Sequence, residues 1–276
     1  MSKRRRTMTW TALHFNGTVS LDSARAAALA LVGVSGSPRL VLEVTGRGGV
    51  VSWKLGCEAW ARGRVLDALR AQVPGLTTDS LPSTFDGLRV DQAARLRFAV
   101  SAAVANSGLA VDLTEQAVRG LLGALARTDR AELLHLQVIL GPRRAPRVGG
   151  SRARGARQSA RDRDGQHQVR CEVRIGASTR DSARSRSLIQ AVVGSLRPLQ
   201  TGGVRFSALG TSVKGFSRAR SPLLWSNQLT ANEITPLTGW PIAAPRAAPL
   251  PGVPSPHPRL IRASPTTPSN GRQLGV

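Results

Sequence analysis

The sequence lacks tyrosine and is poor in lysine, cysteine and acidic residues. Its two cysteines, Cys57 and Cys171, are too few for a disulfide framework, and with four scattered histidines they form no zinc motif. The longest apolar run, residues 26–34, is far shorter than the about 18 residues that indicate a transmembrane helix. Alternating residues, and no apolar signal-peptide core, follow the basic N-terminus. We therefore expect a cytoplasmic chain without a structural metal or a transmembrane segment.

The charge is strongly unbalanced, because 39 Lys and Arg oppose 16 Asp and Glu and give a net charge of +23. Only Lys3, Lys54 and Lys214 are lysines, so arginine supplies almost all of the positive charge. Such a surplus favours a polyanionic partner, either nucleic acid or anionic lipid. A GC-rich genome also enriches arginine. The hydrophobic content of 41% excludes wholesale disorder, and 276 residues suffice for two ordinary domains.

Hydrophobic periodicity predicts an α+β fold in which one order of elements occurs twice. In the first part the expected elements are strands at 9–15, 40–44 and 50–55 and helices at 21–32 and 57–73. In the second part they are strands at 95–100, 133–140, 169–175 and 204–209, a helix opened by the capping pair Asp112 and Glu115, and a helix at 182–196. Residues 75–92, rich in Thr, Ser, Pro and Asp, are expected to connect the two parts.

The second part has the ferredoxin-like order strand-helix-strand-strand-helix-strand, and the first part matches five of its elements. We predict two tandem ferredoxin-like (βαββαβ) modules, at 8–92 and 93–210. A basic tail (1–7) precedes them, and a connecting segment (211–240) and a Pro-rich linker (241–276) follow. More than half of the 17 prolines lie in that last segment.

A long basic loop is expected at 142–168, between two adjacent strands of the second module. Two aspartates oppose its arginines, and apolar residues are almost absent. This loop and the N-terminal tail are the candidate contacts to nucleic-acid phosphates. The candidate residues are Arg143, Arg144, Arg147, Arg152, Arg154, Arg157, Arg161, Arg163, Lys3, Arg4, Arg5 and Arg6. The alternative is a solvated charge run without a partner.

No constellation of residues indicates catalysis. No lysine has the spacing of a phosphate-binding loop, and no GxSxG nucleophile motif occurs. Cys57 is expected at a helix start, where the helix dipole lowers a thiol pKa, whereas Cys171 is expected in the core. His135 is expected opposite the apolar face of its strand, and Glu43 and Glu172 are expected to be outward charges. We therefore expect neither an enzyme nor a cofactor.

The ferredoxin-like order also invites comparison with the RNA-recognition fold, which stacks bases on aromatic side chains of an open sheet face. Phe98 is expected to point to the core with its apolar neighbours. The expected outward residues of the central strands are all arginines: Arg95, Arg97, Arg170 and Arg174. This pattern argues against base reading and leaves contacts to the nucleic-acid backbone open.

A series of short motifs carries a resemblance to a known family. They are RLVLE (39–43), LHLQVILGP (134–142), RSPLLW (220–225), LTGWPI (237–242), LPGVP (250–254), HPRL (257–260) and GRQLG (271–275). In this order they resemble the N-terminal region of actinobacterial TraG/TraD-like conjugative DNA-transfer proteins. These are coupling-protein ATPases of type IV secretion, related to the HerA/FtsK motors. The resemblance covers nearly the whole chain and is most specific from residue 220 onward.

The resemblance implies a role in conjugation without catalysis, because the ATP-binding lysine and the acidic Mg²⁺-associated residue of the family have no counterpart here. We expect a non-catalytic N-terminal region, from a truncated or split gene or as a free-standing accessory form. Its expected partners are DNA, a motor ATPase domain and other type IV secretion components, and the resemblance implies a place at the inner face of the cell membrane. The alternative is a stand-alone basic protein that binds nucleic acid non-specifically.

Overall fold

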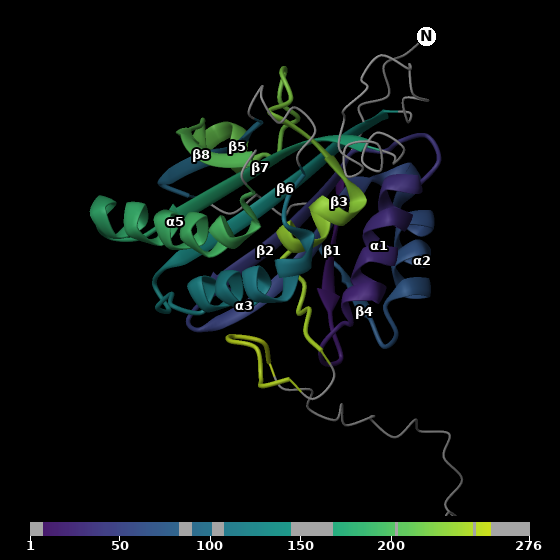
Figure 1. Cartoon of the computed structure of the whole chain (residues 1–276), viewed down its shortest axis with the longest axis horizontal. Helices are drawn as coiled ribbons and strands as arrows, with labels where there is room; N and C mark the ends of the chain where they lie inside the picture. Colours follow the sequence, from purple (N-terminus) through teal and green to yellow (C-terminus); the bar gives the residue numbers. More distant parts are fainter. Residues whose placement is uncertain are drawn as a thin grey trace, which may run out of the picture.

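Period-two strands and apolar helical stripes assemble into an α+β architecture (Figure 1). The structure is a computed structural model and describes residues 8–82, 90–100, 108–144, 168–201, 204–244 and 247–254. Within these ranges nine strands form one antiparallel sheet. The strands are β1 (Met8–His14), β2 (Leu40–Arg47), β3 (Val50–Glu58), β4 (Thr77–Ser80), β5 (Gln92–Val100), β6 (Leu133–Arg144), β7 (Gln168–Ser178), β8 (Val204–Gly210) and β9 (Asn227–Thr230). The described helices are α1 (Leu21–Gly33), α2 (Arg62–Gln72), α3 (Thr114–Leu125), α5 (Ser182–Leu196), α6 (Val213–Ser217) and α7 (Ala231–Ile234).

The sheet has the strand order β4-β1-β3-β2-β6-β7-β5-β8, and β9 pairs with β7 beside this path. The first half consists of β1 to β4 and the second half of β5 to β8. Read from its outer edge inward, each half has its fourth strand first, followed by its first, third and second strands. The halves join through the antiparallel pair β2–β6, from Leu40 opposite Leu140 to Gly46 opposite Leu134. One hydrophobic cluster contains buried residues of both halves. Sheet and core are therefore continuous across the junction.

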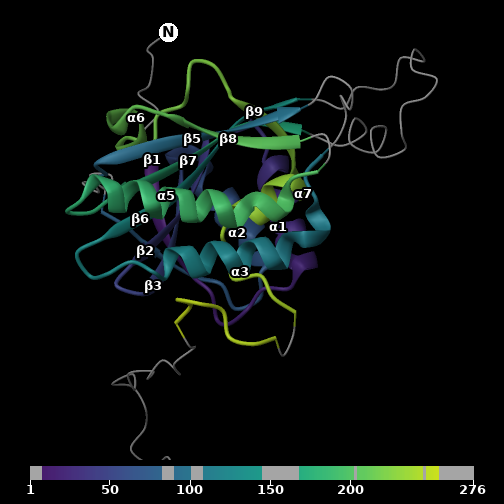
Figure 2. The ribbon, with the colours of Figure 1, turned by 60° about the vertical axis from the view of Figure 1, so that its left-hand side comes forward.

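Four longer helices cover one face of the sheet, as pairs α1–α2 and α3–α5 (Figures 1 and 2). Helix α5 illustrates how local sequence specifies these helices. The Asp181 carboxylate accepts hydrogen bonds from the backbone amides of Ala183 and Arg184 and caps the N-terminus of the helix. Leu188 and Val192, four residues apart, are buried on one face of the helix. The helix has the bounds that the sequence predicted.

The chain after β9 runs between the two helix pairs as what we call the C-terminal strap, residues 231–243. Trp240 in the strap is 1% exposed. The indole nitrogen of Trp53 donates a hydrogen bond to the carbonyl oxygen of Gly239 at 2.6 Å. Ile242 pairs with Val19 as an isolated parallel bridge. The strap thereby connects the sheet to the helical layer of both halves.

The expectation of an extended linker from residue 241 onward is corrected for the described residues 241–244 and 247–254. Ile242 and Leu250 are buried, and the amide of Val51 donates to the carbonyl oxygen of Gly252 at 2.8 Å. Apolar residues between the prolines hold this stretch on the core, which proline content alone does not reveal. Residues 255–276 lie outside the described ranges.

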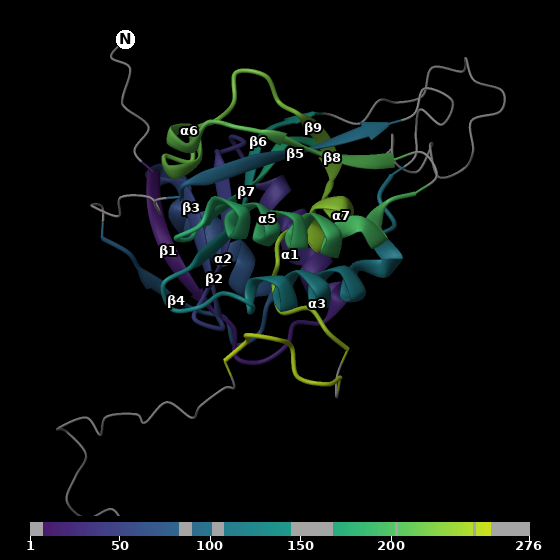
Figure 3. The same cartoon turned by 90° about the vertical axis from the view of Figure 1, so that its left-hand side faces the viewer.

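The second face of the sheet is also partly covered, by residues 211–226, which we call the cover segment. Figure 3 shows α6, part of this segment, on the side of the sheet opposite to α3 and α5. Two of its aromatic rings lie directly on glycines of the sheet, Phe216 on Gly176 and Trp225 on Gly141. A Cβ at position 141 would stand 2.3 Å from the Trp225 ring, so any larger residue there would displace the ring.

Two local expectations from the sequence are corrected. Residues 75–92 contain a strand, β4, which pairs with β1 at the edge of the sheet. Cys57 lies in β3 and not at a helix start, because a short 3₁₀ turn at Ala59–Ala61 separates β3 from α2. The strand continues past residue 55, since Gly56 and Cys57 keep their pairing with both β1 and β2.

Candidate functional site

The structure describes two of the predicted phosphate-contacting residues. Arg143 is exposed at the end of β6, and Arg144 is the last residue of that strand. The others lie outside the described residues: Arg147, Arg152, Arg154, Arg157, Arg161, Arg163, Lys3, Arg4, Arg5 and Arg6.

Further exposed arginines gather at the end of the sheet where β6 ends and β7 begins. Arg143 stands opposite Val169, next to Arg170 in β7. Arg97 in β5 and Arg205 in β8 lie near the same end of their strand pair, and both are exposed. Four described arginines, one on each of four strands, therefore lie at this end of the sheet.

The sheet splits at this end, because β5 and β9 share one edge of β7. β5 pairs with the second part of β7, up to Leu96 opposite Val173, whereas β9 pairs with its first four residues. The Asn227 side chain bridges the split: its Oδ1 accepts from the Phe98 amide at 2.8 Å, and its Nδ2 donates to the Leu96 carbonyl at 2.9 Å. The amide side chain thus satisfies the backbone of β5 where β5 leaves β7.

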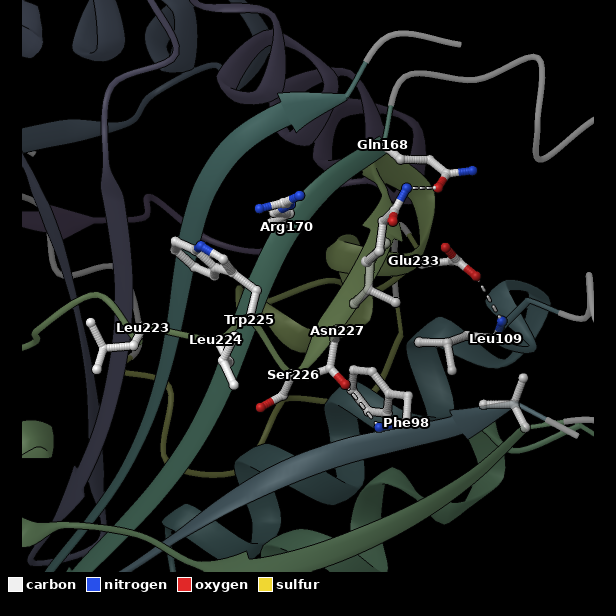
Figure 4. Close-up of a pocket in the computed structure, with 13 residues that line it drawn as sticks. Phe98, Leu109, Gln168, Arg170, Leu223, Leu224, Trp225, Ser226, Asn227 and Glu233 are labelled. Carbon is white, nitrogen blue, oxygen red and sulfur yellow. Dashed lines mark hydrogen bonds between the residues drawn. The ribbon is translucent and has the colours of Figure 1, made fainter. Parts of the chain in front are cut away.

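A pocket of about 490 Å³ opens at this split (Figure 4). This volume lies within the about 300–1,000 Å³ of small-ligand sites. Arg170, Trp225 and Ser226 contribute to its walls, with Phe98 and Asn227 on the side of β5.

Two neighbouring leucines of the cover segment stand at the same pocket and remain in solvent. Leu223 is 102% exposed and Leu224 is 83% exposed. The two adjacent leucines thus form a small exposed apolar surface at the mouth of the pocket.

Several polar groups of the pocket are already bound to the protein. The Glu233 carboxylate accepts from the amides of Leu109, at 3.1 Å, and Thr230, at 2.8 Å. Gln228 donates to the side-chain oxygen of Gln168. By contrast, the guanidinium of Arg170 makes no hydrogen bond or ion pair with another described residue. Arg170 is therefore the charged group that the pocket offers to a ligand.

A buried polar network lies under the cover segment, where the sequence predicted outward charges. Glu43 is 6% exposed and His135 is 1% exposed. One oxygen of Glu43 accepts from the Gln137 amide at 2.8 Å and lies 3.4 Å from His135 Nε2. His135 Nδ1 is 2.8 Å from the Thr45 hydroxyl. Burial raises the pKa of the Glu43 carboxyl, but His135 and Gln137 outweigh it and leave the pKa below its usual value.

The same network fixes the cover segment to the sheet. Arg174 Nε donates to Glu172 at 2.5 Å, and its Nη1 donates to the carbonyl oxygen of Gly215 at 3.1 Å. Gln137 donates to the carbonyl oxygen of Phe216 at 3.3 Å. The expectation that Glu43, Glu172 and Arg174 are outward charges is therefore wrong, because a later part of the chain covers their face. Their contacts hold structure in place.

The cysteines have the environment of core residues. Cys57 and Cys171 are both 0% exposed, and burial raises the pKa of each thiol. Cys171 is in the core as predicted, whereas the lowered pKa expected for Cys57 is wrong. No group of three or more His, Cys, Asp and Glu able to hold a metal occurs in the described part of the chain. No helix there is long and apolar enough to cross a membrane.

No pattern in the sequence indicates the pocket itself. Leu223, Leu224 and Trp225 lie in the motif at 220–225 that carries part of the family resemblance. The available signal was the apolar run Pro-Leu-Leu-Trp within a polar stretch. The position of β9 against β7, which builds the pocket wall, depends on pairing between residues about 60 positions apart.

Comparisons with known proteins assign no family. No protein-family description matches the chain, and no curated protein matches it. A solved structure described as an anthrone oxidase-like protein is similar over 76% of this chain and 93% of that chain, with 10% identity and a TM-score of 0.21. A similarity this weak carries no argument about fold or function.

Proposed function

We propose that this chain is the non-catalytic N-terminal region of a conjugative DNA-transfer coupling ATPase, and that it contacts DNA through the phosphate backbone. The family part rests on the motif series, and the DNA part rests on the geometry. The observation that carries DNA contact is the group of exposed arginines around one end of the sheet: Arg97, Arg143, Arg170 and Arg205. Guanidinium groups bind phosphate oxygens with two parallel hydrogen bonds, and several together supply affinity without sequence preference.

The basic segment lies, in the sequence, between two strands that carry members of this group. The chain leaves the described sheet after Arg144 and returns at Gln168, and Gln168 itself lines the pocket. Six of the predicted arginines lie between these two points in the sequence. The arginines at the end of the sheet and the predicted basic loop are thus parts of one proposed contact surface.

The proposal includes two tandem ferredoxin-like modules. The strand order of each half, β4-β1-β3-β2 and β8-β5-β7-β6, supports it, because the ferredoxin-like fold places its strands in the order fourth, first, third, second. In this proposal the C-terminal strap and cover segment, which contain the motifs at 220–225 and 237–242, hold the modules together for assembly.

The DNA contact is tested by fluorescence anisotropy with labelled duplex and single-stranded DNA at several salt concentrations. We expect affinity that falls steeply with salt, and a double variant Arg170→Gln/Arg205→Gln that lowers the duplex salt slope by about 2. Arg186→Gln on the exposed side of α5 is the matched control and should leave the slope unchanged. Deleting residues 143–163 should remove most of the binding. Salt-independent affinity, or equal slopes for all variants, contradicts the DNA contact.

The family assignment is tested separately, by the ability to bind a motor domain. The purified chain should hydrolyse no ATP, and it should co-purify with the ATPase domain of a coupling protein from the same conjugative element. DNA binding without any association with such a domain favours the second candidate, a stand-alone non-specific nucleic-acid-binding protein. The exposed arginines at the end of the sheet support that candidate equally well. ATP hydrolysis by the chain alone refutes the non-catalytic role.

A further inference from the structure

We propose that the pocket between β5 and β9 seats an unpaired base of single-stranded nucleic acid, with an adjoining phosphate on Arg170. This inference rests on the proposed contact to nucleic acid and deepens it, because it predicts a preference for single strands. Arginine contacts to phosphate alone would distinguish paired from unpaired strands only through the difference in their charge density.

The first support is the composition of the pocket. Proteins that hold single strands combine cations that follow the backbone with aromatic side chains on which bases stack. Here the indole of Trp225 and the side chains of Leu223 and Leu224 stand at the pocket together with the guanidinium of Arg170 (Figure 4). Both kinds of group thus occur within one cavity of about 490 Å³.

The second support is that the indole ring at the pocket is held in position by the fold. Trp225 lies against Gly141 of β6, where a Cβ would stand 2.3 Å from the ring. Its neighbour Asn227 is held by two hydrogen bonds to β5. A platform held from both sides costs little conformational entropy when a base stacks on it.

The third support is the charge around the pocket. The two carboxylates near it are bound within the protein: Glu172 accepts from Arg174, and Glu233 accepts from two backbone amides. Arg170 and Arg205 are exposed. An anionic strand therefore meets cations at the rim and no unpartnered carboxylate of the described residues in the pocket wall.

Duplex DNA does not offer this ligand, because its bases are stacked and paired. Phe98 on the sheet is unsuited to base reading, because it is buried, at 9% exposure, as the sequence predicts. The aromatic platform here is Trp225 of the cover segment, and not an aromatic side chain of the sheet itself.

The test compares two single strands of about 12 nucleotides in anisotropy titrations of the full chain. One is oligothymidylate, and the other has the same sugar-phosphate backbone with abasic sites throughout. We expect the strand with bases to bind about tenfold more tightly than the abasic strand. The double variant Leu223→Ser/Leu224→Ser should lose most of this difference and keep its affinity for the abasic strand.

Because both leucines are exposed, the double variant should fold, and circular dichroism checks this. Leu29→Ser, at a position 55% exposed on α1, is the control and should keep the full difference. Trp225→Leu gives a second measurement at the ring and should also reduce the preference for bases. Arg170→Gln should weaken both strands alike and lower the salt slope by about 0.7.

Equal affinity for the two strands overturns the base-seating inference and leaves the proposed phosphate contact standing. No binding to either strand overturns the phosphate contact as well. Anionic phospholipid vesicles provide a further arm. If they bind in a manner that needs Leu223 and Leu224, while the two strands bind equally, the pocket surface serves a lipid headgroup region and the inference is wrong.

Discussion

Truncation of Trp240 tests whether the C-terminal strap is part of the folded core. The side chain is 1% exposed, although it lies at the start of a proline-rich stretch. A buried tryptophan removes about 150–250 Å² from water, which at about 25 cal/mol per Å² amounts to about 4–6 kcal/mol. Because alanine keeps part of this burial and neighbours relax partly, Trp240→Ala should lower the free energy of unfolding by about 3–5 kcal/mol.

Urea unfolding followed by far-ultraviolet circular dichroism measures this loss, since removing an indole alters tryptophan fluorescence directly. The midpoint should fall while the dependence on urea stays constant. Thermal unfolding should shift down by about 6–20 °C. Leu223→Ala, at a position 102% exposed, is the control and should change stability by less than about 0.5 kcal/mol.

A second substitution separates packing from hydrogen bonding at the strap. Trp53→Phe keeps an aromatic ring but removes the donor to the Gly239 carbonyl oxygen, and should cost about 1–3 kcal/mol. An extended segment would make Trp240→Ala neutral. A loss below about 0.5 kcal/mol for Trp240→Ala would therefore refute the packing of the strap.

Three further predictions concern other parts of the fold. Gly141→Ala should destabilise by about 1–3 kcal/mol because its Cβ meets the indole above it, whereas Gly63→Ala, with no atom within 4 Å, should be neutral or stabilising in urea unfolding. The pKa of Glu43 is lowered in the folded protein, so its contribution to the free energy of unfolding is present above the ordinary carboxyl pKa of 4.5 and is lost as the pH falls through the folded value. In Glu43→Gln the free energy of unfolding should therefore fall less steeply in acid. An unchanged dependence of stability on pH contradicts this. Cys57 and Cys171 should resist a thiol reagent at pH 8 until urea unfolds the chain, because burial raises both thiol pKa values; rapid labelling of the native protein would disprove it.

Hydrophobic periodicity and capping residues predicted most of the longer helices and strands. The stripe that includes Leu188 and Val192, with Asp181 before it, is enough to place α5, because cap and apolar face are both encoded within a few residues. Strand β7 is likewise visible from its alternation. In such elements the deciding contacts repeat along one segment, so a single sequence contains them.

Elements whose partners are distant in the sequence were missed. β4 has no apolar alternation and becomes a strand by pairing with β1, about 65 residues before it. β9 has only four residues and pairs with the start of β7. Alternation of apolar and polar residues also distinguishes the two faces of a strand, but it does not indicate whether the polar face is exposed to solvent. For Glu43 and Arg174 it meets the cover segment, so their charges are buried.

The buried charges of Glu172 and Arg174 have a structural role, because both side chains contact the cover segment. A buried ion pair gains little stability over apolar packing, but removing one partner is strongly destabilising. Arg174 binds Glu172 and also the backbone of the cover segment at Gly215, so the network selects one position for that segment. Ser226, which follows the Trp225 platform, lies 3.5 Å from the second oxygen of Glu172. The polar contacts to Gly215 and Ser226 and the packing of Phe216 and Trp225 on glycines of the sheet together hold the pocket wall in place.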